Sequence, residues 1–271
     1  MSFLATSPVL AGSGVSAASS ASSAGATSMV DAVNSVSAAS AAVLPAAPND
    51  QTWGDNPVIT QMLLPAVGET LLMVGWSSLV TIILGLPLGL LLASSSASGL
   101  RPRPVLNSVV GFIVNIVRSF PFIVLIIALI PFTRFIVGTS LGWQATVVPL
   151  SIAAIPFFAR LVESNVAAVN PGKIEAAQMM GASNLRIQWG VQVREALPSL
   201  VQSATVLVIT LIGYSAMAGA VGGGGLGQMA INYGYNRFQN DTMICTVVLI
   251  IVIVQVVQMV GDMVSRLVDH R

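Results

Sequence analysis

The residues able to carry out acid–base, nucleophilic or metal chemistry are few in this sequence, and they do not cluster. His270, the only histidine, is the next-to-last residue, and Cys245, the only cysteine, lies in an apolar run. Intramembrane proteolysis would need a Ser/His pair, paired aspartates or a zinc motif within the apolar segments, and the sequence contains none of these. We therefore predict no catalytic residue, no metal site and no enzymatic activity.

A glycine-rich run, GGGGLG at residues 222–227, is the one motif that could cradle a phosphate. A P-loop needs a preceding strand and a Lys-Ser or Lys-Thr pair after the glycines, and neither is found here. The glycines are better explained by close backbone approach and by dihedral angles that other residues avoid. The chain is therefore not expected to bind ATP or to need a cofactor of its own.

Charged residues gather instead in one internal segment, NPGKIEAAQMMGASNLRIQWG, at residues 170–190. Asn170 and Pro171 are typical of a helix start, because Asn caps the first amides and Pro has no amide hydrogen to leave unpaired. Gly181 is typical of a helix end, and Ser183 can cap a following helix. The pattern alone fits two interpretations: an amphipathic segment on a membrane surface, or a docking site for a partner protein.

Composition places these motifs in an integral membrane protein. Among 271 residues, 55% are hydrophobic and only 8% are charged, with a mean hydropathy of +0.86. Soluble domains contain roughly one quarter charged residues. The formal net charge of +1 and the absence of a Lys/Arg cluster argue against nucleic-acid binding.

The positions of the charges divide the chain into five predicted membrane-spanning helices, since a hydrocarbon core about 30 Å thick needs roughly 20 uncharged residues. Arg118 interrupts the second of these, which is the least clearly defined. The predicted spans cover residues 70–94, 108–132, 141–162, 197–219 and 242–261, with a loop at 163–196 between the third and fourth.

The orientation follows from the positive charges, which favour the cytoplasmic side. With the amino terminus outside and the carboxyl terminus inside, the cytoplasmic segments hold eight Lys or Arg residues and the outer loops hold two, Arg134 and Arg237. The eight are Arg101, Arg103, Arg160, Lys173, Arg186, Arg194, Arg266 and Arg271. The loop at 163–196 is then cytoplasmic.

The first 56 residues differ from the rest in composition. They are rich in Ser and Ala and have no aromatic residue between Phe3 and Trp53. We predict a low-complexity, disordered and extracytoplasmic tail at 1–56, followed by a transmembrane domain at 57–271. A secretory signal would begin with positive residues, and this tail has none.

The charged loop also resembles a known motif. Its EAAQMMGAS stretch is similar to the EAA loop of ABC-importer permeases, in which Glu-Ala-Ala is followed by three residues and a glycine. In that family the loop forms a coupling helix that docks into a separate ATP-hydrolysing subunit. The resemblance therefore implies ATPase coupling by a short stretch: Glu175, Ala176, Ala177, Met180, Gly181, Ala182 and Ser183.

One part of the family pattern is missing. The family often has a Leu-Pro pair beginning twelve or so residues after the glycine, and here Val193 and Arg194 occupy those positions. A later pair, Leu197 and Pro198, remains. The departure leaves open only the path of the chain into the fourth span.

Two further stretches narrow the resemblance to the permease subunit of methionine importers: RSFPFIVLIIALIPFTRFIVGTSLG and the segment ending in GYSAMAGAVGGGGLGQMAINYGY. The resemblance covers about residues 57–268. It implies an all-α, five-helix permease core that forms a homodimer in the plasma (inner) membrane, with two ATPase subunits that bind the ATP, an external substrate-binding protein and lipid as its partners.

The same resemblance makes the end of the fourth span a candidate translocation path and gate. This span is rich in small and polar residues, which also serve helix packing. The predicted path and gate residues are Tyr214, Ser215, Met217, Gly219, Gly224 and Gly225. A soft pocket containing Met217 would suit the thioether of L- or D-methionine.

Arg118 allows two interpretations. It could be an intramembrane charge with a function, facing the protein interior, or it could lie near the cytoplasmic end and extend its side chain to the surface. Asn115, one turn earlier, is its expected polar neighbour.

The cargo and the class of transporter each have alternatives. The same architecture serves other solutes, such as glycine betaine or a phosphonate. A channel would not require an EAA loop, which favours an importer driven by ATP.

Overall fold

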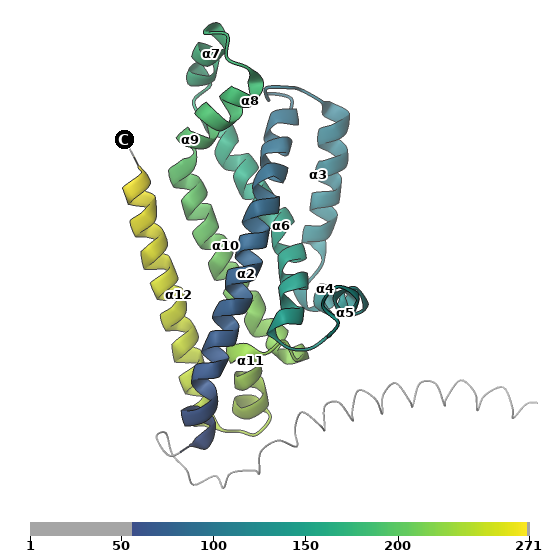
Figure 1. Ribbon diagram of the computed structural model, residues 1–271, viewed down its shortest axis with the longest axis vertical. Coiled ribbons are helices and arrows are strands. Elements are labelled where there is room, and N and C mark those ends of the chain that lie inside the picture. The colour runs from purple at the N-terminus through teal and green to yellow at the C-terminus, as the bar shows by residue number, and fades with distance from the viewer. Residues whose placement is uncertain (1–55, 270–271) are drawn as a thin grey trace, which may run out of the picture. The chain divides into compact units, whose positions relative to one another are not determined.

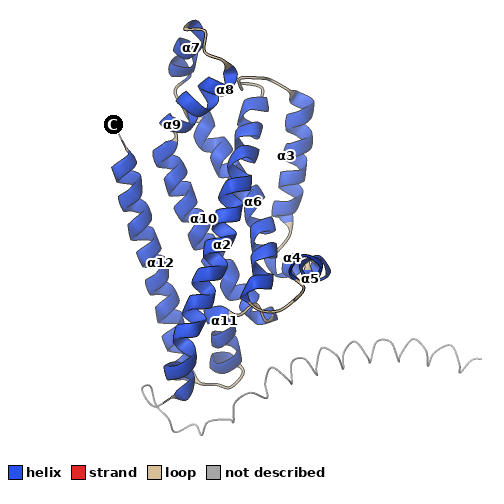
Figure 2. Ribbon diagram, in the orientation of Figure 1, coloured by secondary structure: helices blue, strands red, loops and turns tan. Residues whose placement is uncertain are grey.

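A computed structural model describes residues 56–269, and in this part of the chain every element is a helix (Figure 2). This confirms the predicted all-α fold class, which a bilayer favours because a helix satisfies its own backbone hydrogen bonds. The Ser/Ala-rich segment predicted at 1–56 lies outside the described residues except for Asn56, as do His270 and Arg271. Its disorder and its location therefore stay predictions.

Long helices alternate with short ones along the chain (Figure 1). The long ones are α2 (Pro57–Ser95), α3 (Pro104–Ser119), α6 (Trp143–Ala167), α10 (Leu197–Ala218) and α12 (Asn240–Val268). Between them lie α4 (Phe122–Ala128), α5 (Ile130–Val137), α7 (Pro171–Met179), α8 (Asn184–Ile187), η2 (Gln188–Gln192), α9 (Val193–Glu195), η3 (Gly219–Val221), α11 (Gly225–Met229) and η4 (Ala230–Tyr235).

Four helical segments are long and apolar enough to cross a membrane: α2, α6, the continuous run Leu197–Val221 formed by α10 and η3, and α12. The pair α3 and α4 passes the same test together but is bent by 98°. The count is five if that pair forms one broken span. The short helices α7 and α8 lie at one end of these spans, and α11 lies at the other (Figure 1).

The bend differs from the straight second span predicted at 108–132. Phe120 adopts an extended backbone with ψ of 128°, and Pro121 follows it. Proline lacks an amide hydrogen and disfavours the helical conformation in the residue before it, so α3 ends there. The chain then turns into α4 and α5 instead of continuing along the axis of α3.

Helix α2 begins earlier than the predicted first span at residue 70. Asn56 caps it, with Oδ1 accepting a hydrogen bond from the Val58 amide at 3.0 Å, and Pro57 occupies the first helical position. Its 39 residues correspond to about 58 Å of helix, well beyond the roughly 30 Å hydrocarbon core.

The centre of the fold is the contact between α2 and α6, with α10 packed against both. Glycines on α2 permit the close approach: a Cβ at Gly89 would lie 2.6 Å from Cβ of Val162, and one at Gly85 would lie 3.0 Å from the Phe158 ring. Phe158 and Val162 are completely or almost completely buried. Larger residues at these glycines would push the two helices apart.

Helix α12 is the most exposed spanning helix, with 6% of its apolar window buried. It packs mainly on α10, where Gly261 lies against Thr205. In water such a surface would be unfavourable, whereas in a bilayer the surrounding lipid is itself apolar. This face is therefore available to lipid or to a second membrane chain.

Candidate functional sites

The segment with the EAA-like motif forms the predicted helix and turn. Oδ1 of Asn170 accepts a hydrogen bond from the Gly172 amide at 2.8 Å, and α7 runs from there to Met179. Gly181 ends the turn with φ of +77°, donating its amide to the Gln178 carbonyl at 2.9 Å, while the Ala182 amide donates to Ala177 at 3.1 Å. This pair of bonds is the Schellman arrangement, which favours glycine at the left-handed position.

The side chains of this segment face in two directions. Ala177 is 5% exposed and packs inside the chain, whereas Met179 and Met180 are 91% and 81% exposed. Glu175, Ala176, Gly181 and Ser183 are exposed as well, and Ala182 is partly buried. Of the predicted coupling residues, Ala177 thus holds α7 on the fold, and the others form an outward surface.

An ion pair ties α7 to the start of the fourth span. Nζ of Lys173 contacts Oε2 of Glu195, and both side chains are partly exposed. Glu195 is the last residue of α9, directly before α10. The path into that span, which the sequence left open, follows η2 and α9, and α10 begins at Leu197 with Pro198 in its first turn.

The glycine-rich run lies at the opposite end of α10. Gly222, Gly224 and Gly225 have φ of +81°, +82° and +70°, a region that other residues rarely adopt. Gly219 lies against the backbone of Gly227, so a side chain there would meet main-chain atoms. The run therefore makes the tight reversal from α10 through η3 into α11.

Two residues of α2 hold this reversal in place. Oε2 of Glu69 accepts a hydrogen bond from the Gly225 amide at 2.7 Å, and Oγ1 of Thr70 accepts one from the Leu226 amide at 2.9 Å. Thr70 is buried and Glu69 is partly buried. Together they satisfy the first two amides of α11, which have no partner within that helix.

Sequence reasoning missed Glu69 and Thr70. An acidic residue such as Glu69 at the edge of an apolar helix is itself a signal of function. The sequence does not show its partner, because Gly225 is 156 residues away in the chain.

The predicted path residues on α10 have different surroundings. The Tyr214 ring stacks on Phe122 of α4 with centroids 4.5 Å apart, and Met217 is 52% exposed. Ser215 is buried, and its hydroxyl donates to the Ile212 carbonyl at 2.7 Å. Tyr214 and Met217 are therefore accessible, while Ser215 serves the helix backbone.

Arg118 joins Tyr214 at a cavity of about 150 Å³. The remaining lining is mostly aromatic or apolar, and includes Phe120, Phe122, Leu125 and Phe157. Among residues 56–269, the Arg118 side chain makes no hydrogen bond or ion pair. A guanidinium group thus borders an aromatic cavity without a protein counter-ion.

The structure distinguishes between the two interpretations of Arg118 and corrects its expected neighbour. Arg118 lies in the last turn of α3, about 21 Å along the axis from the start of that helix, so it does not lie near the end that carries α7 and α8. Its expected neighbour Asn115 instead accepts a hydrogen bond from Arg160 of α6 at 3.1 Å. Arg160 also pairs with Glu163 at 2.7 Å.

The features above agree with the comparisons with known proteins. The family model of the binding-protein-dependent transport system inner membrane component matches residues 85–271. The chain belongs to this family. It is a multi-pass inner-membrane permease component, as its apolar helices require.

Relatives and a solved structure extend the match. The chain is 50% identical to the probable D-methionine transport system permease protein MetI of Vibrio cholerae over 78% of this chain and 94% of that protein. It is 43% identical to the methionine import system permease protein MetP of Bacillus subtilis, over 67% and 82% of the two chains. A chain of the MetNI methionine ABC transporter in inward-facing conformations superposes with a TM-score of 0.78 at 44% identity, over 79% of this chain and 99% of that one. The predicted ABC-importer permease core is thereby confirmed.

The anchoring of the glycine-rich reversal in this permease can be tested by hydrogen exchange. Replacing Glu69 by Ala leaves the Gly225 amide without its acceptor, at a cost of about 1–3 kcal/mol. We expect amides at 222–229 to exchange about tenfold faster or more, with a smaller change for Glu69→Gln, which retains a neutral oxygen. Exchange in α7 should not change.

Glu163→Ala is the matched control, because it removes an acidic residue of another spanning helix whose partner is Arg160. It should leave exchange at 222–229 as in the wild type. Unchanged protection of this segment in Glu69→Ala would show that the hydrogen bond does not hold the reversal.

Proposed function

We propose that this chain is the membrane-spanning subunit of an ATP-driven methionine importer, and that two copies enclose the path of the amino acid. The observation that carries the proposal is the 50% identity to a D-methionine transport permease over nearly all of that protein. Within this matched core the EAA-like segment projects from one end of the spans (Figure 1). The chain supplies the path and a partner supplies the energy.

The exposed face of α7 is the proposed site of coupling to the ATPase subunit. Met179 and Met180 are almost fully exposed, yet the turn beneath them is fixed by the Schellman bonds of Gly181. Exposed apolar residues on a rigid support are typical of protein interfaces. ATP would be bound by the partner, since this chain has no P-loop motif.

The ion pair between Lys173 and Glu195 gives this coupling a physical route. A movement of α7 would be passed through Glu195 to α10, whose other end carries Tyr214, Met217 and the glycine-rich reversal. Gly219, Gly224 and Gly225 would then lie at the gate, with Glu69 as the residue that fixes it.

The remaining partners and the orientation follow from the same proposal. The α7 end would face the cytoplasm, the amino terminus would lie outside, and an external binding protein would deliver the solute to the α11 end. The excess of Lys and Arg in the segments at the α7 end supports this orientation. The exposed α12 would contact lipid or the second copy.

Uptake of labelled methionine tests the proposal directly. In proteoliposomes containing this chain, its ATPase and its binding protein, we expect ATP-dependent uptake that L- or D-methionine inhibits and that glycine betaine and phosphonate do not. Inhibition by glycine betaine or phosphonate would still support an ATP-driven importer, but it would reject methionine as the cargo. Solute flow without ATP would reject the importer.

Coupling can be tested at Gly181. Valine at this position would have to adopt φ of +77°, which costs roughly 1–2 kcal/mol or more for a residue with a side chain. We expect the Gly181→Val variant to insert normally into the membrane and to take up methionine several-fold more slowly. ATP hydrolysis and methionine uptake should then no longer be coupled.

Gly138→Val is the matched control. Gly138 has φ of +82° and, like Gly181, no atom within 4 Å of an added Cβ, but it ends α5 far from α7. It carries the same backbone strain and should retain coupled uptake. Normal uptake by Gly181→Val would contradict the docking model.

The cavity beside Arg118 is the proposed resting point of the amino acid within the path. Its unpaired guanidinium would bind the carboxylate, and the rings of Tyr214 and Phe157 would contact the thioether. Its volume of about 150 Å³ is below the roughly 300–1,000 Å³ of pockets for drug-sized ligands, so it suits a small solute.

Protection from labelling measures this binding. A Leu125→Cys substitution in a Cys245→Ser background places one thiol in the cavity, and methionine should slow its reaction with a maleimide. Adding Arg118→Gln should raise the protecting concentration about tenfold or more, since a hydrogen bond to a charged group is lost. Arg134→Gln on α5 should have no effect, and equal protection with and without Arg118 would reject the site.

A further inference from the structure

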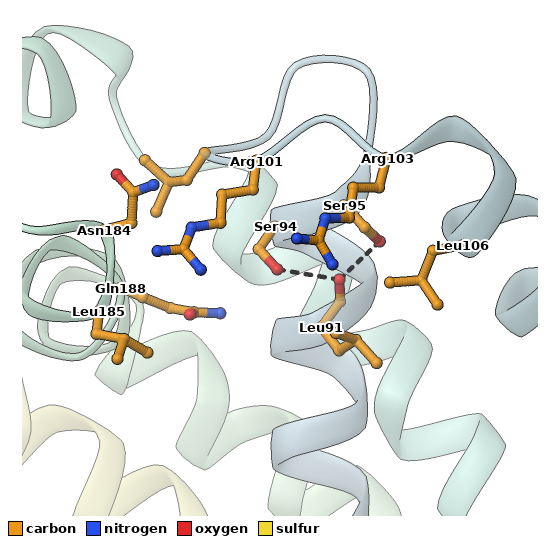
Figure 3. A pocket seen from close by; sticks show the side chains of 10 residues that line it. Leu91, Ser94, Ser95, Arg101, Arg103, Leu106, Asn184, Leu185 and Gln188 are labelled. Atoms are coloured by element: carbon orange, nitrogen blue, oxygen red, sulfur yellow. Dashed lines mark hydrogen bonds between the residues drawn. The ribbon is translucent and has the colours of Figure 1, made fainter.

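A separate cavity of about 210 Å³ lies at the α7–α8 end of the fold. It is bordered by the end of α2, by the loop that leads to α3 and by the start of α8 and η2 (Figure 3). Its polar lining comprises Ser94, Ser95, Arg101, Arg103, Asn184 and Gln188. The proposed path and the coupling turn use none of these residues.

Two cations face this cavity without an anion. Arg101 and Arg103 are exposed, and within residues 56–269 their side chains form no hydrogen bond or ion pair. Figure 3 shows the Arg101 guanidinium between Gln188 and the end of α2, and the Arg103 guanidinium beside Ser94 and Ser95. No acidic residue lines the cavity. An anionic ligand would supply the missing charge.

Three other polar side chains of the lining are already engaged. The hydroxyls of Ser94 and Ser95 donate to the Leu91 carbonyl at 3.1 and 2.7 Å, as Figure 3 shows, and Gln188 donates to the Leu90 carbonyl at 2.9 Å. Among residues 56–269, the polar side chains of the lining without a hydrogen-bond partner are therefore Asn184 and the two arginines. The forked geometry of the two guanidinium groups matches the oxygens of a phosphate group.

The rest of the lining is apolar. Leu91, Leu106 and Leu185 border the cavity, and Leu91 and Leu185 are exposed. This apolar surface would not favour the binding of a small soluble anion, whereas the first carbons of an acyl chain would cover it and remove it from water. The cavity thus combines a cationic part with an apolar part.

Its position along the chain fits the boundary of a bilayer. Helix α2 ends at Ser95 after a long apolar run, and Arg101 and Arg103 follow within the same short loop. Arg at the end of a span places its charge at the level of the lipid headgroups. Basic pockets between spanning helices at this level bind anionic lipid headgroups.

We propose that this cavity binds the phosphate-bearing headgroup of an anionic phospholipid, held by Arg101 and Arg103, with an acyl chain along Leu91 and Leu185. The bound headgroup would join the α2–α3 loop to α8, which directly follows the coupling turn. It would thereby stabilise α8 and η2, against which α7 packs. This proposal does not depend on which solute is carried.

Direct binding to the purified full chain in neutral detergent tests it, by native mass spectrometry or calorimetry. The probes are short-chain phosphatidylglycerol, short-chain phosphatidylcholine and glycerol phosphate. We expect the wild type to bind phosphatidylglycerol about tenfold more tightly than either of the other two. The double variant Arg101→Gln/Arg103→Gln should lose this preference.

Two further variants separate charge from folding. Arg101→Lys/Arg103→Lys keeps both charges and should keep part of the preference. Arg266→Gln removes an exposed positive charge from the last turn of α12, outside the cavity, and should bind as the wild type does. Each variant is first shown to have the helix content and elution volume of the wild type.

Three results would overturn the proposal. Equal affinity of the Gln double variant and the wild type for phosphatidylglycerol would show that the arginines do not bind the headgroup. Equal affinity for glycerol phosphate and phosphatidylglycerol would indicate a free-anion site. Weaker binding of the ATPase subunit by the double variant, with phosphatidylglycerol binding unchanged, would show that the arginines serve a protein interface.

Discussion

The hydrogen bonds that the first amides of α11 donate to Glu69 and Thr70 are the contacts on which the arrangement of this chain depends. In a bilayer no water is available to satisfy a backbone amide, so a break in a spanning helix is stable only if side chains or other backbone groups replace the missing bonds. The reversal at Gly222–Gly225 is such a break, and α2 supplies the acceptors across 156 residues of sequence. The same bonds place the end of α10 against the beginning of the first span.

Two other breaks in the helices are satisfied by local means. At Phe120–Pro121 the proline has no amide to satisfy, and the chain turns by 98° with few lost bonds. At Gly181 the Schellman bonds pair the exposed carbonyls of α7. The three breaks therefore differ in one respect, because only the glycine-rich reversal depends on a residue from a distant helix. It is the break that a movement of α2 relative to α10 would disturb first.

This distinction explains what could be predicted from the sequence. The helix start at Asn170, the turn at Gly181 and the class of fold depend on neighbouring residues or on composition, and they were predicted correctly. The 98° bend is not evident from the run of uncharged residues around Arg118, because it depends on Pro121, which disfavours a helical conformation in the residue before it. The pairing of Asn115 with Arg160 and the roles of Glu69 and Thr70 depend on which helices pack together, and no local pattern contains that information.

Helix α10 connects the two ends at which function is proposed. Its 22 residues extend about 33 Å, close to the thickness of the hydrocarbon core. At one end Glu195 pairs with Lys173 of α7, and at the other the chain enters the reversal held by Glu69. A helix of this length is stiff along its axis, so a displacement of α7 that the ion pair transmits would appear as a rotation or shift at Tyr214 and Met217. The exposed ion pair is the weaker of the two attachments, since it is screened by water and salt. The reversal, buried and bonded to α2, is the fixed end about which such a movement would turn.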